Sequence, residues 1–220
     1  EVPMAKYHTM VGIGAEDTNK LEMLQQWLEQ CLNASMPLMD TTKGEVNSGQ
    51  KGFSLSQLST QQTLREVEFY FPLEQAKQST LAQILSKHRG GLPTALPSHP
   101  VLKGMMHGFI DLIFEHQGQY FVADYKSNYL GDSLEDYHEL AMLEANQNHY
   151  YDLQYLIYSL ALHRYLGQRI ANYDPAQHFG GVYYLYLRGM SPKAATGIFA
   201  KAVSLTELHE LDQLFAGEAP

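Results

Sequence analysis

The sequence predicts an α/β protein in which a mixed central sheet is flanked by helices. Two observations predict it: segments rich in β-branched and aromatic residues recur along the chain, and segments with helical spacing lie between them. With 45% hydrophobic and 11% aromatic residues, 220 residues suffice for one sizeable packed core. These patterns alone leave both an α/β and an α+β arrangement open.

Residues 1–52 are expected to form a helical lead-in and a loop that belong to the same domain as the rest. Apolar residues recur at steps of three and four from Leu21 to Cys31, which predicts an amphipathic helix that ends before Pro37. Residues 40–52 are polar and contain glycine, which predicts a loop or a disordered connection. The single cysteine excludes an internal disulfide and is expected in the core of a protein from a reducing compartment.

Residues 53–220 are expected to form the main core. The segment 64–73 alternates and is rich in aromatic and β-branched residues, which predicts a strand that Pro72 ends. A helix is expected next, with Ser79 as its N-cap and Gly90 just beyond its end. The later elements are expected to be a hairpin within 109–128, helices over 133–147 and 150–166, strands over 181–189 and 197–205, and a helix over 205–215.

The hairpin segment "FIDLIFEHQGQYFVADYKSN", residues 109–128, carries charges inside two apolar runs. If Gln117-Gly118 is a two-residue turn, Asp111 lies directly opposite Asp124 across the antiparallel pair. Opposed side chains have Cβ atoms about 4.5–5.5 Å apart, and like charges placed so repel. Lys126 shares the face of Asp124 because side chains alternate along a strand.

Two opposed carboxylates either share a proton or bind a cation. Mg²⁺ and Mn²⁺ prefer carboxylate, water and phosphate oxygens, and an ammonium beside them suits charge developing on a phosphoryl group. The pattern therefore points to metal-assisted phosphodiester hydrolysis. The alternative is a solvated strand face on which Lys126 is a simple ion-pair partner, but the apolar flanks of both aspartates favour strands buried on both faces.

The segments "GFIDLIF" and "YFVADYKSN" closely resemble the metal-binding core of the PD-(D/E)XK nuclease superfamily, whose fold is restriction-endonuclease-like. Four further segments, "LKGFIDL", "DYKSNYLG", "YDLQYLIYSLALHRYL" and "HFGGVYYLYLRG", are similar to the C-terminal nuclease domains of the RecB family, over about residues 53–189. The resemblance implies a metal-dependent exodeoxyribonuclease domain that uses Mg²⁺, for which Mn²⁺ substitutes, and that acts in double-strand-break repair and recombination.

The resemblance also assigns residue roles. It implies metal binding at Asp111, Asp124 and Tyr125 and makes Lys126 the catalytic lysine. Glu66 matches the acidic residue of the preceding strand. Glu68, on the same face by parity, is the alternative, and an exposed structural glutamate is a further one.

Gln154 and Tyr158 match a Q-x-x-x-Y element of the family. Their i, i+4 spacing places both on one helix face, where they are expected to contact a DNA strand or the groups behind the active site. Simple helix packing is an equally good explanation for Tyr158.

One family feature has no convincing equivalent. The first metal ligand of the family is a histidine in an upstream G-x-x-x-H-like element, and His8 in "AKYHTM" lacks that context. The chain is expected to begin downstream of that histidine, so weak activity is expected for these residues alone.

The remaining expectations concern partners. The net charge of −9 argues against a general phosphate-binding surface, so DNA is expected to be delivered by other parts of an assembly. By resemblance these are an upstream helicase region of the same polypeptide, which uses ATP, and RecC-like and RecD-like subunits of a heterotrimer. The chain contains no G-x-x-x-x-G-K-[ST] element and no apolar run of membrane-spanning length, and a soluble, cytoplasmic protein is expected.

Two alternative functions stay open. One is a nuclease-like fold with an inert site that serves as a protein–protein interaction module, against which the intact Asp111, Asp124 and Lys126 argue. The other is a nuclease for RNA or structured DNA, which uses the same phosphate chemistry.

Overall fold

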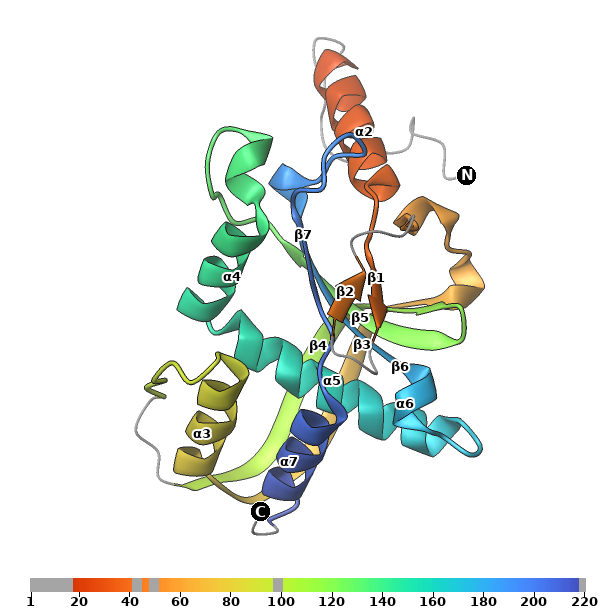
Figure 1. Ribbon diagram of the computed structural model, residues 1–220. Coiled ribbons are helices and arrows are strands. Elements are labelled where there is room, and N and C mark those ends of the chain that lie inside the picture. The colour runs from red at the N-terminus through yellow and green to blue at the C-terminus, as the bar shows by residue number, and fades with distance from the viewer. Residues whose placement is uncertain (1–17, 41–44, 48–51, 97–100, 218–220) are drawn as a thin grey trace.

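A mixed five-stranded sheet organises the protein, for which a computed structural model describes residues 18–40, 45–47, 52–96 and 101–217. The strands follow the order β3-β4-β5-β6-β7, and every neighbouring pair is antiparallel except β5 with β6. Helices flank this sheet (Figure 1), so the predicted fold class is confirmed. The strands are β3 (Thr63–Lys77), β4 (Val101–His116), β5 (Gln119–Lys126), β6 (Phe179–Tyr186) and β7 (Ile198–Lys201).

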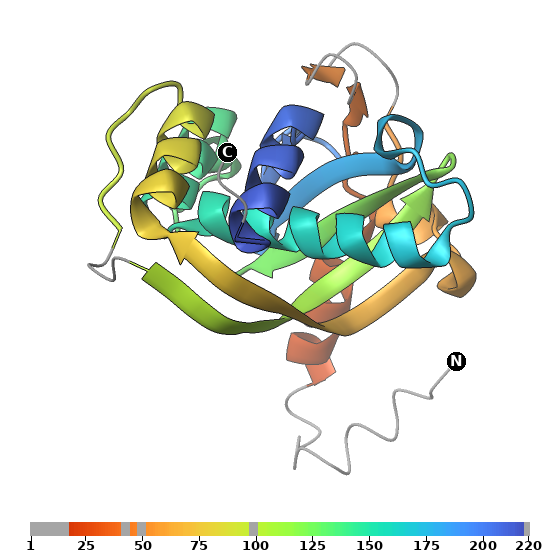
Figure 2. The same ribbon diagram turned by 90° about the horizontal axis from the view of Figure 1, so that it is seen from below.

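The first two strands of the sheet form a long curved ribbon. Figure 2 shows β3 and β4 passing along the side of three helices, α3 (Gln78–His88), α5 (Tyr151–Arg169) and α7 (Leu205–Phe215). The prediction that Pro72 ends the strand is wrong, because Pro72 pairs with Met105 in the middle of the ladder. The strand β3 lies at the edge of the sheet, where a residue without an N–H is tolerated.

The hairpin between β4 and β5 has the predicted register. Gln117 and Gly118 both have positive φ, 54° and 83°, as a two-residue type I′ turn requires. His116 pairs with Gln119, and the ladder continues in register to Leu112 opposite Ala123. The next residues in the same register are Asp111 and Asp124.

The parallel pair β5 and β6 is connected by helices, as parallel strands require. The connection contains α4 (Glu139–Asn148), α5 and the short α6 (Pro175–His178). Both predicted helices of this segment are present, but the first begins at Glu139 instead of residue 133, because a separate 3₁₀ turn precedes it. Short 3₁₀ turns cover Leu55–Gln57, Thr60–Gln62, Leu134–Tyr137 and Leu187–Gly189.

Two hydrophobic cores lie on opposite faces of the sheet. The helix-side core joins β3, β4, β5 and β6 to α3, α4, α5 and α7, with Leu85, Ile110, Leu156 and Leu211 among its buried residues. The opposite core joins the sheet to the end of α2 (Thr18–Asn33) and to β1 (Leu38–Asp40), and it includes Cys31, Met36, Phe53 and Phe114. Both faces of the strands at the centre of the sheet are therefore buried, as predicted.

Three local predictions have definite outcomes. Cys31 is buried, as expected. Within the segment predicted as loop, Glu45–Asn47 forms a short strand, β2, that pairs with β1. The N-cap of α3 is Lys77 instead of Ser79, because β3 runs directly into the helix, and Gly90 follows the helix with φ 71°, as expected of a residue that ends a helix.

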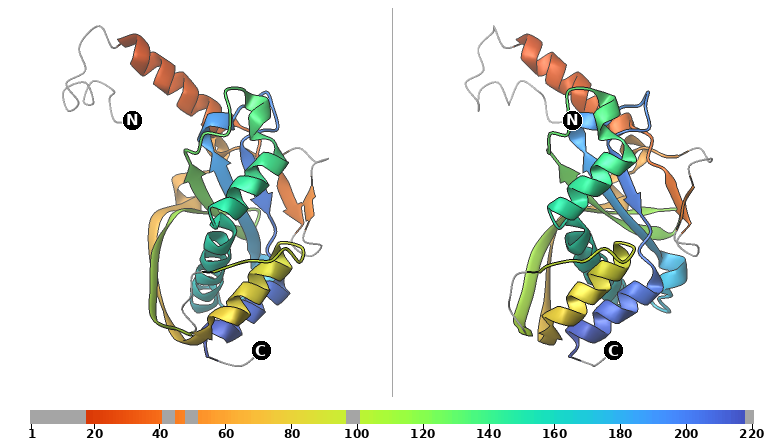
Figure 3. Two further views of the ribbon diagram at one scale, coloured as in Figure 1. Left: turned by 90° about the vertical axis from the view of Figure 1, so that its left-hand side faces the viewer. Right: turned by 60° about the vertical axis from the view of Figure 1, so that its left-hand side comes forward.

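The helix α2 projects from the end of the molecule opposite the C-terminal helix (Figure 3). None of the helices in the described ranges is long and apolar enough to cross a membrane.

Candidate active site

Asp124 and Lys126 lie at the end of β5 and form a buried ion pair. The exposed fraction is 4% for Asp124 and 7% for Lys126, and the Lys126 Nζ lies 2.5 Å from the Asp124 Oδ2. Both residues face α5, because Val122, two residues before Asp124, belongs to the helix-side core and Ala123 belongs to the opposite one. The structure therefore holds both charges on one face, away from water.

The side chain of Asp111 is held near the ion pair by a hydrogen bond from the backbone of β5. The Tyr125 N–H donates to the Asp111 Oδ2 over 3.0 Å. Tyr125 lies between Asp124 and Lys126 in the sequence, so this bond holds the Asp111 carboxylate against β5 beside both residues. The side chain of Tyr125 is 42% exposed and lies on the other face of the strand. The hairpin thus brings Asp111 next to the ion pair.

The electrostatics of the site favour a cation. Burial raises the pKa of Asp124, the Lys126 ammonium opposes this shift, and the Asp111 carboxylate adds to it. Because one ammonium faces two neighbouring carboxylates, negative charge at the site is incompletely balanced.

Gln154 on α5 connects the ion pair to the helix. Its Oε1 accepts a hydrogen bond of 2.9 Å from the Lys126 Nζ, and its Nε2 donates to the Tyr158 hydroxyl over 2.9 Å. Tyr158 also packs against Phe69 on β3, with ring centroids 5.7 Å apart. Gln154 therefore contacts Lys126 directly, whereas Tyr158 contacts Gln154 and packs against Phe69, and the role of both residues in binding or catalysis stays a prediction.

Two tyrosines that the sequence did not single out enclose Lys126. The ammonium lies 3.8 Å from the ring centroid of Tyr151 on α5 and 4.6 Å from that of Tyr184 on β6. The Tyr184 hydroxyl donates to the Gln154 Oε1 over 2.9 Å. Tyr184 lies in the segment 181–189, for which the sequence predicts only a strand. The one sequence signal for Tyr151 is its position three residues before Gln154.

Glu66 lies opposite Asp111 in a distorted part of the ladder. The pairs on either side are Arg65 with Leu112 and Val67 with Ile110, and Glu66 itself has φ 50°. A positive φ interrupts the extended strand, so simple alternation does not carry from Glu66 to the residues after it.

Glu68 has partners of its own. It accepts hydrogen bonds from the Tyr70 hydroxyl and from His107, on the exposed face of the β3–β4 ribbon. The choice between Glu66 and Glu68 as the further acidic residue stays a prediction, and His8 lies outside the described residues.

The described residues bring two carboxylates together at this site. Among them, no group of three or more His, Cys, Asp or Glu side chains has the arrangement to hold a metal ion. Two carboxylates still fit Mg²⁺, which is commonly bound through one or two carboxylates together with water and substrate phosphate. Asp111 and Asp124 would hold such an ion, and Glu66 is not gathered with them in this structure.

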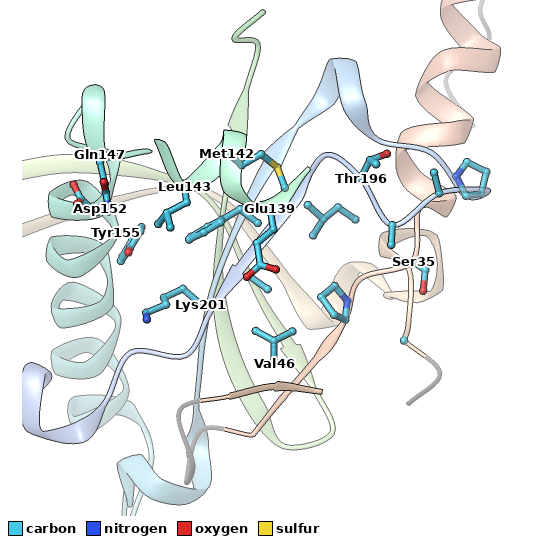
Figure 4. Close-up of a pocket in the computed structure, with 18 of the residues that line it drawn as sticks. Ser35, Val46, Glu139, Met142, Leu143, Gln147, Asp152, Tyr155, Thr196 and Lys201 are labelled. Carbon is cyan, nitrogen blue, oxygen red and sulfur yellow. The ribbon is translucent and has the colours of Figure 1, made fainter. Parts of the chain in front are cut away.

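A separate cavity of about 800 Å³ lies elsewhere, between α4, the start of α5 and β7. Figure 4 shows Glu139, Leu143 and Lys201 on its walls, with Asp152 and Tyr155 of α5 at one end. None of Asp111, Asp124 and Lys126 lines it. This cavity is therefore not the candidate active site, which is identified instead by the charged side chains of Asp111, Asp124 and Lys126.

Comparisons with known proteins identify the family of this chain. A family model for the PD-(D/E)XK nuclease superfamily matches residues 7–218. The RecBCD enzyme subunit RecB of Escherichia coli (strain K12) is 39% identical over 208 residues, and that of Haemophilus influenzae is 36% identical over 199 residues. The RecBCD enzyme subunit RecB of Mycolicibacterium smegmatis is 30% identical over 217 residues.

These alignments cover most of this chain and a small part of each relative. They include 93%, 90% and 85% of the chain, but 17%, 16% and 20% of the respective relatives. The similarity therefore concerns one region of much longer proteins.

Proposed function

Because the chain belongs to the PD-(D/E)XK nuclease superfamily and is similar to RecB, we propose that it is a metal-dependent DNA nuclease domain of a RecB-like exodeoxyribonuclease subunit. The observation that carries the proposal is the buried Asp124–Lys126 pair beside Asp111. Desolvating these charges is costly, and placing a second carboxylate, Asp111, beside the pair favours a role in catalysis over a role in shape alone.

In the proposed reaction, Asp111 and Asp124 would hold Mg²⁺. A bound ion supplies a water of lowered pKa and neutralises charge on the phosphoryl group. Lys126 donates a hydrogen bond to the attacking water or to a phosphoryl oxygen. Glu66 and Tyr125 remain proposed as additional metal-contacting positions, and Gln154 orients Lys126 through the hydrogen bond between them.

We also propose that this domain acts inside a larger assembly. The relatives named above are subunits of the RecBCD enzyme, which suggests RecC-like and RecD-like partners and a helicase region in the same polypeptide. A net charge of −9 makes efficient capture of DNA by the domain alone unfavourable. The helicase would deliver the strand, and the nuclease site would cut it during repair and recombination.

The test is Mg²⁺-dependent cleavage of linear DNA by the complete polypeptide, with its partner subunits present and ATP supplied. Asp124→Asn should abolish cleavage while ATP hydrolysis continues, and urea unfolding should show that the fold is kept. Glu144→Gln, which changes an exposed carboxylate on α4, is the matched control and should cut like the wild type. Cleavage by Asp124→Asn at the wild-type rate would contradict the proposed function and favour an interaction module.

A further inference from the structure

The ammonium of Lys126 is held by more than its charge partner. Lys126 carries three N–H donors, of which one meets the Asp124 carboxylate and one meets the Gln154 amide oxygen. The faces of two aromatic rings, Tyr151 and Tyr184, close two further sides at 3.8 Å and 4.6 Å. These two tyrosines are called the tyrosine cage below.

The cage comes from two elements that are far apart in the sequence. Tyr151 is the first residue of α5, and Tyr184 lies in β6, the strand parallel to β5 and paired with it. Tyr184 is opposite Asp124 in that pairing, so the backbone register itself sets one ring beside the ion pair. The Tyr151 hydroxyl donates to the Asn128 Oδ1 over 3.3 Å, which anchors the other ring.

The position of the rings suits an ammonium better than a neutral amine. The face of an aromatic ring is negative, and its attraction for a cation increases when water is excluded. Lys126 is 7% exposed and Tyr184 is fully buried, so the ammonium is largely shielded from water. A flexible lysine chain would otherwise have many rotamers, and the cage leaves it few.

We propose that Tyr151 and Tyr184 are positioning residues for Lys126 in the nuclease reaction. This inference rests on the proposed function. The two rings fix the ammonium beside Asp124 and stabilise its charge, while the hydrogen bond that Lys126 donates to the Gln154 Oε1 sets its direction. The third N–H of Lys126 has no hydrogen-bond partner among the described residues, and in the proposed reaction it is the donor to the scissile phosphate or the attacking water.

Tyr151 is the better residue for a test, because it is only partly buried whereas Tyr184 belongs to the core. In the complete polypeptide with its partner subunits, Tyr151→Leu should reduce the kcat of DNA cleavage about 3- to 30-fold, the range expected for a desolvated cation–π contact. KM should change less, because the proposed role of the ring is to hold the Lys126 ammonium and not to bind DNA. Tyr151→Phe keeps the ring and should restore most of the rate.

A graded series separates the electrostatics of the ring from its shape. Phenylalanines with increasing numbers of ring fluorine atoms at position 151 keep the shape and weaken the negative face, so the rate should fall stepwise. Tyr165→Leu is the matched control: this tyrosine also lies on α5 and contacts a cation, Arg169, at 5.4 Å. It should leave cleavage unchanged.

The outcomes distinguish the two proposals. If Asp124→Asn cuts normally, the proposed nuclease site is wrong. If Asp124→Asn is inactive but Tyr151→Leu cuts like Tyr165→Leu, or the fluorinated series shows no trend, the cage has no positioning role and the inference is overturned.

Discussion

Replacing Lys126 with Met should leave Asp124 as a buried carboxylate without its cation. Methionine has a similar length and no charge, so the change tests the ion pair with little change in packing. The two side chains are 8% and 6% exposed, and their charged atoms are 2.5 Å apart. Removing one partner of a buried pair costs about 3–5 kcal/mol, and we expect about 3 kcal/mol because Asp124 is able to take up a proton instead.

The pH dependence of this loss has a definite sign. Burial already raises the pKa of Asp124 and Lys126 opposes that shift, so the pKa must rise further without the lysine. A carboxyl group with a raised folded-state pKa destabilises the protein above that pKa, and the penalty disappears as pH falls through it. The stability difference between Lys126→Met and wild type should therefore be largest near neutral pH and smaller in mild acid.

Urea unfolding in EDTA at several pH values measures this difference directly. Lys87→Met is the matched control, because Lys87 forms an ion pair with Glu210 while 59% exposed, and it should cost less than about 1 kcal/mol. Added Mg²⁺ should reduce the penalty of Lys126→Met by supplying the missing positive charge. A Lys126→Met protein as stable as the Lys87→Met control at neutral pH would refute the reasoning.

Two other buried interactions give further predictions. Asp152→Ala should cost about 3–5 kcal/mol in urea unfolding, because it leaves the Arg89 guanidinium, bonded to Asp152 at 2.5 Å and 2.8 Å, buried without its carboxylate. A loss below about 1 kcal/mol would mean that this pair is solvated. Burial raises the pKa of Glu207, but hydrogen bonds from His88 and Ser204 outweigh burial and lower the pKa from 4.5 to about 2. The ionised Glu207 therefore contributes about 3 kcal/mol to the free energy of unfolding above pH 4.5, and this contribution is lost as pH falls toward 2. Glu207→Gln should therefore be less stable at neutral pH and lose less stability on acidification; equal acid-induced losses in the two proteins would contradict this.

Much of the site could be predicted from local pattern. The Gln117-Gly118 turn determines the register of the hairpin, and this register makes Asp111 and Asp124 neighbours. Alternation then places Lys126 on the same face. Each of these steps involves residues fewer than twenty positions apart, for which turn chemistry and side-chain alternation are sufficient.

Other parts depended on the edges of the sheet. Pro72 is a sound strand-ending signal in a central strand, but nothing in its neighbourhood shows that β3 lies at an edge where proline is accepted. The positive φ of Glu66 likewise breaks an alternation that the sequence suggests is continuous.

The sequence by itself determined the order of the elements, the register of the central hairpin and the types of residue at the site, because these follow from periodicity and turn residues. Only the tertiary structure decided what surrounds Lys126. Tyr184 reaches it through the pairing of β5 with β6, and Tyr151 through the packing of α5 on the sheet. These contacts join segments separated by a long crossover, and no local pattern specifies which buried tyrosine meets which buried charge.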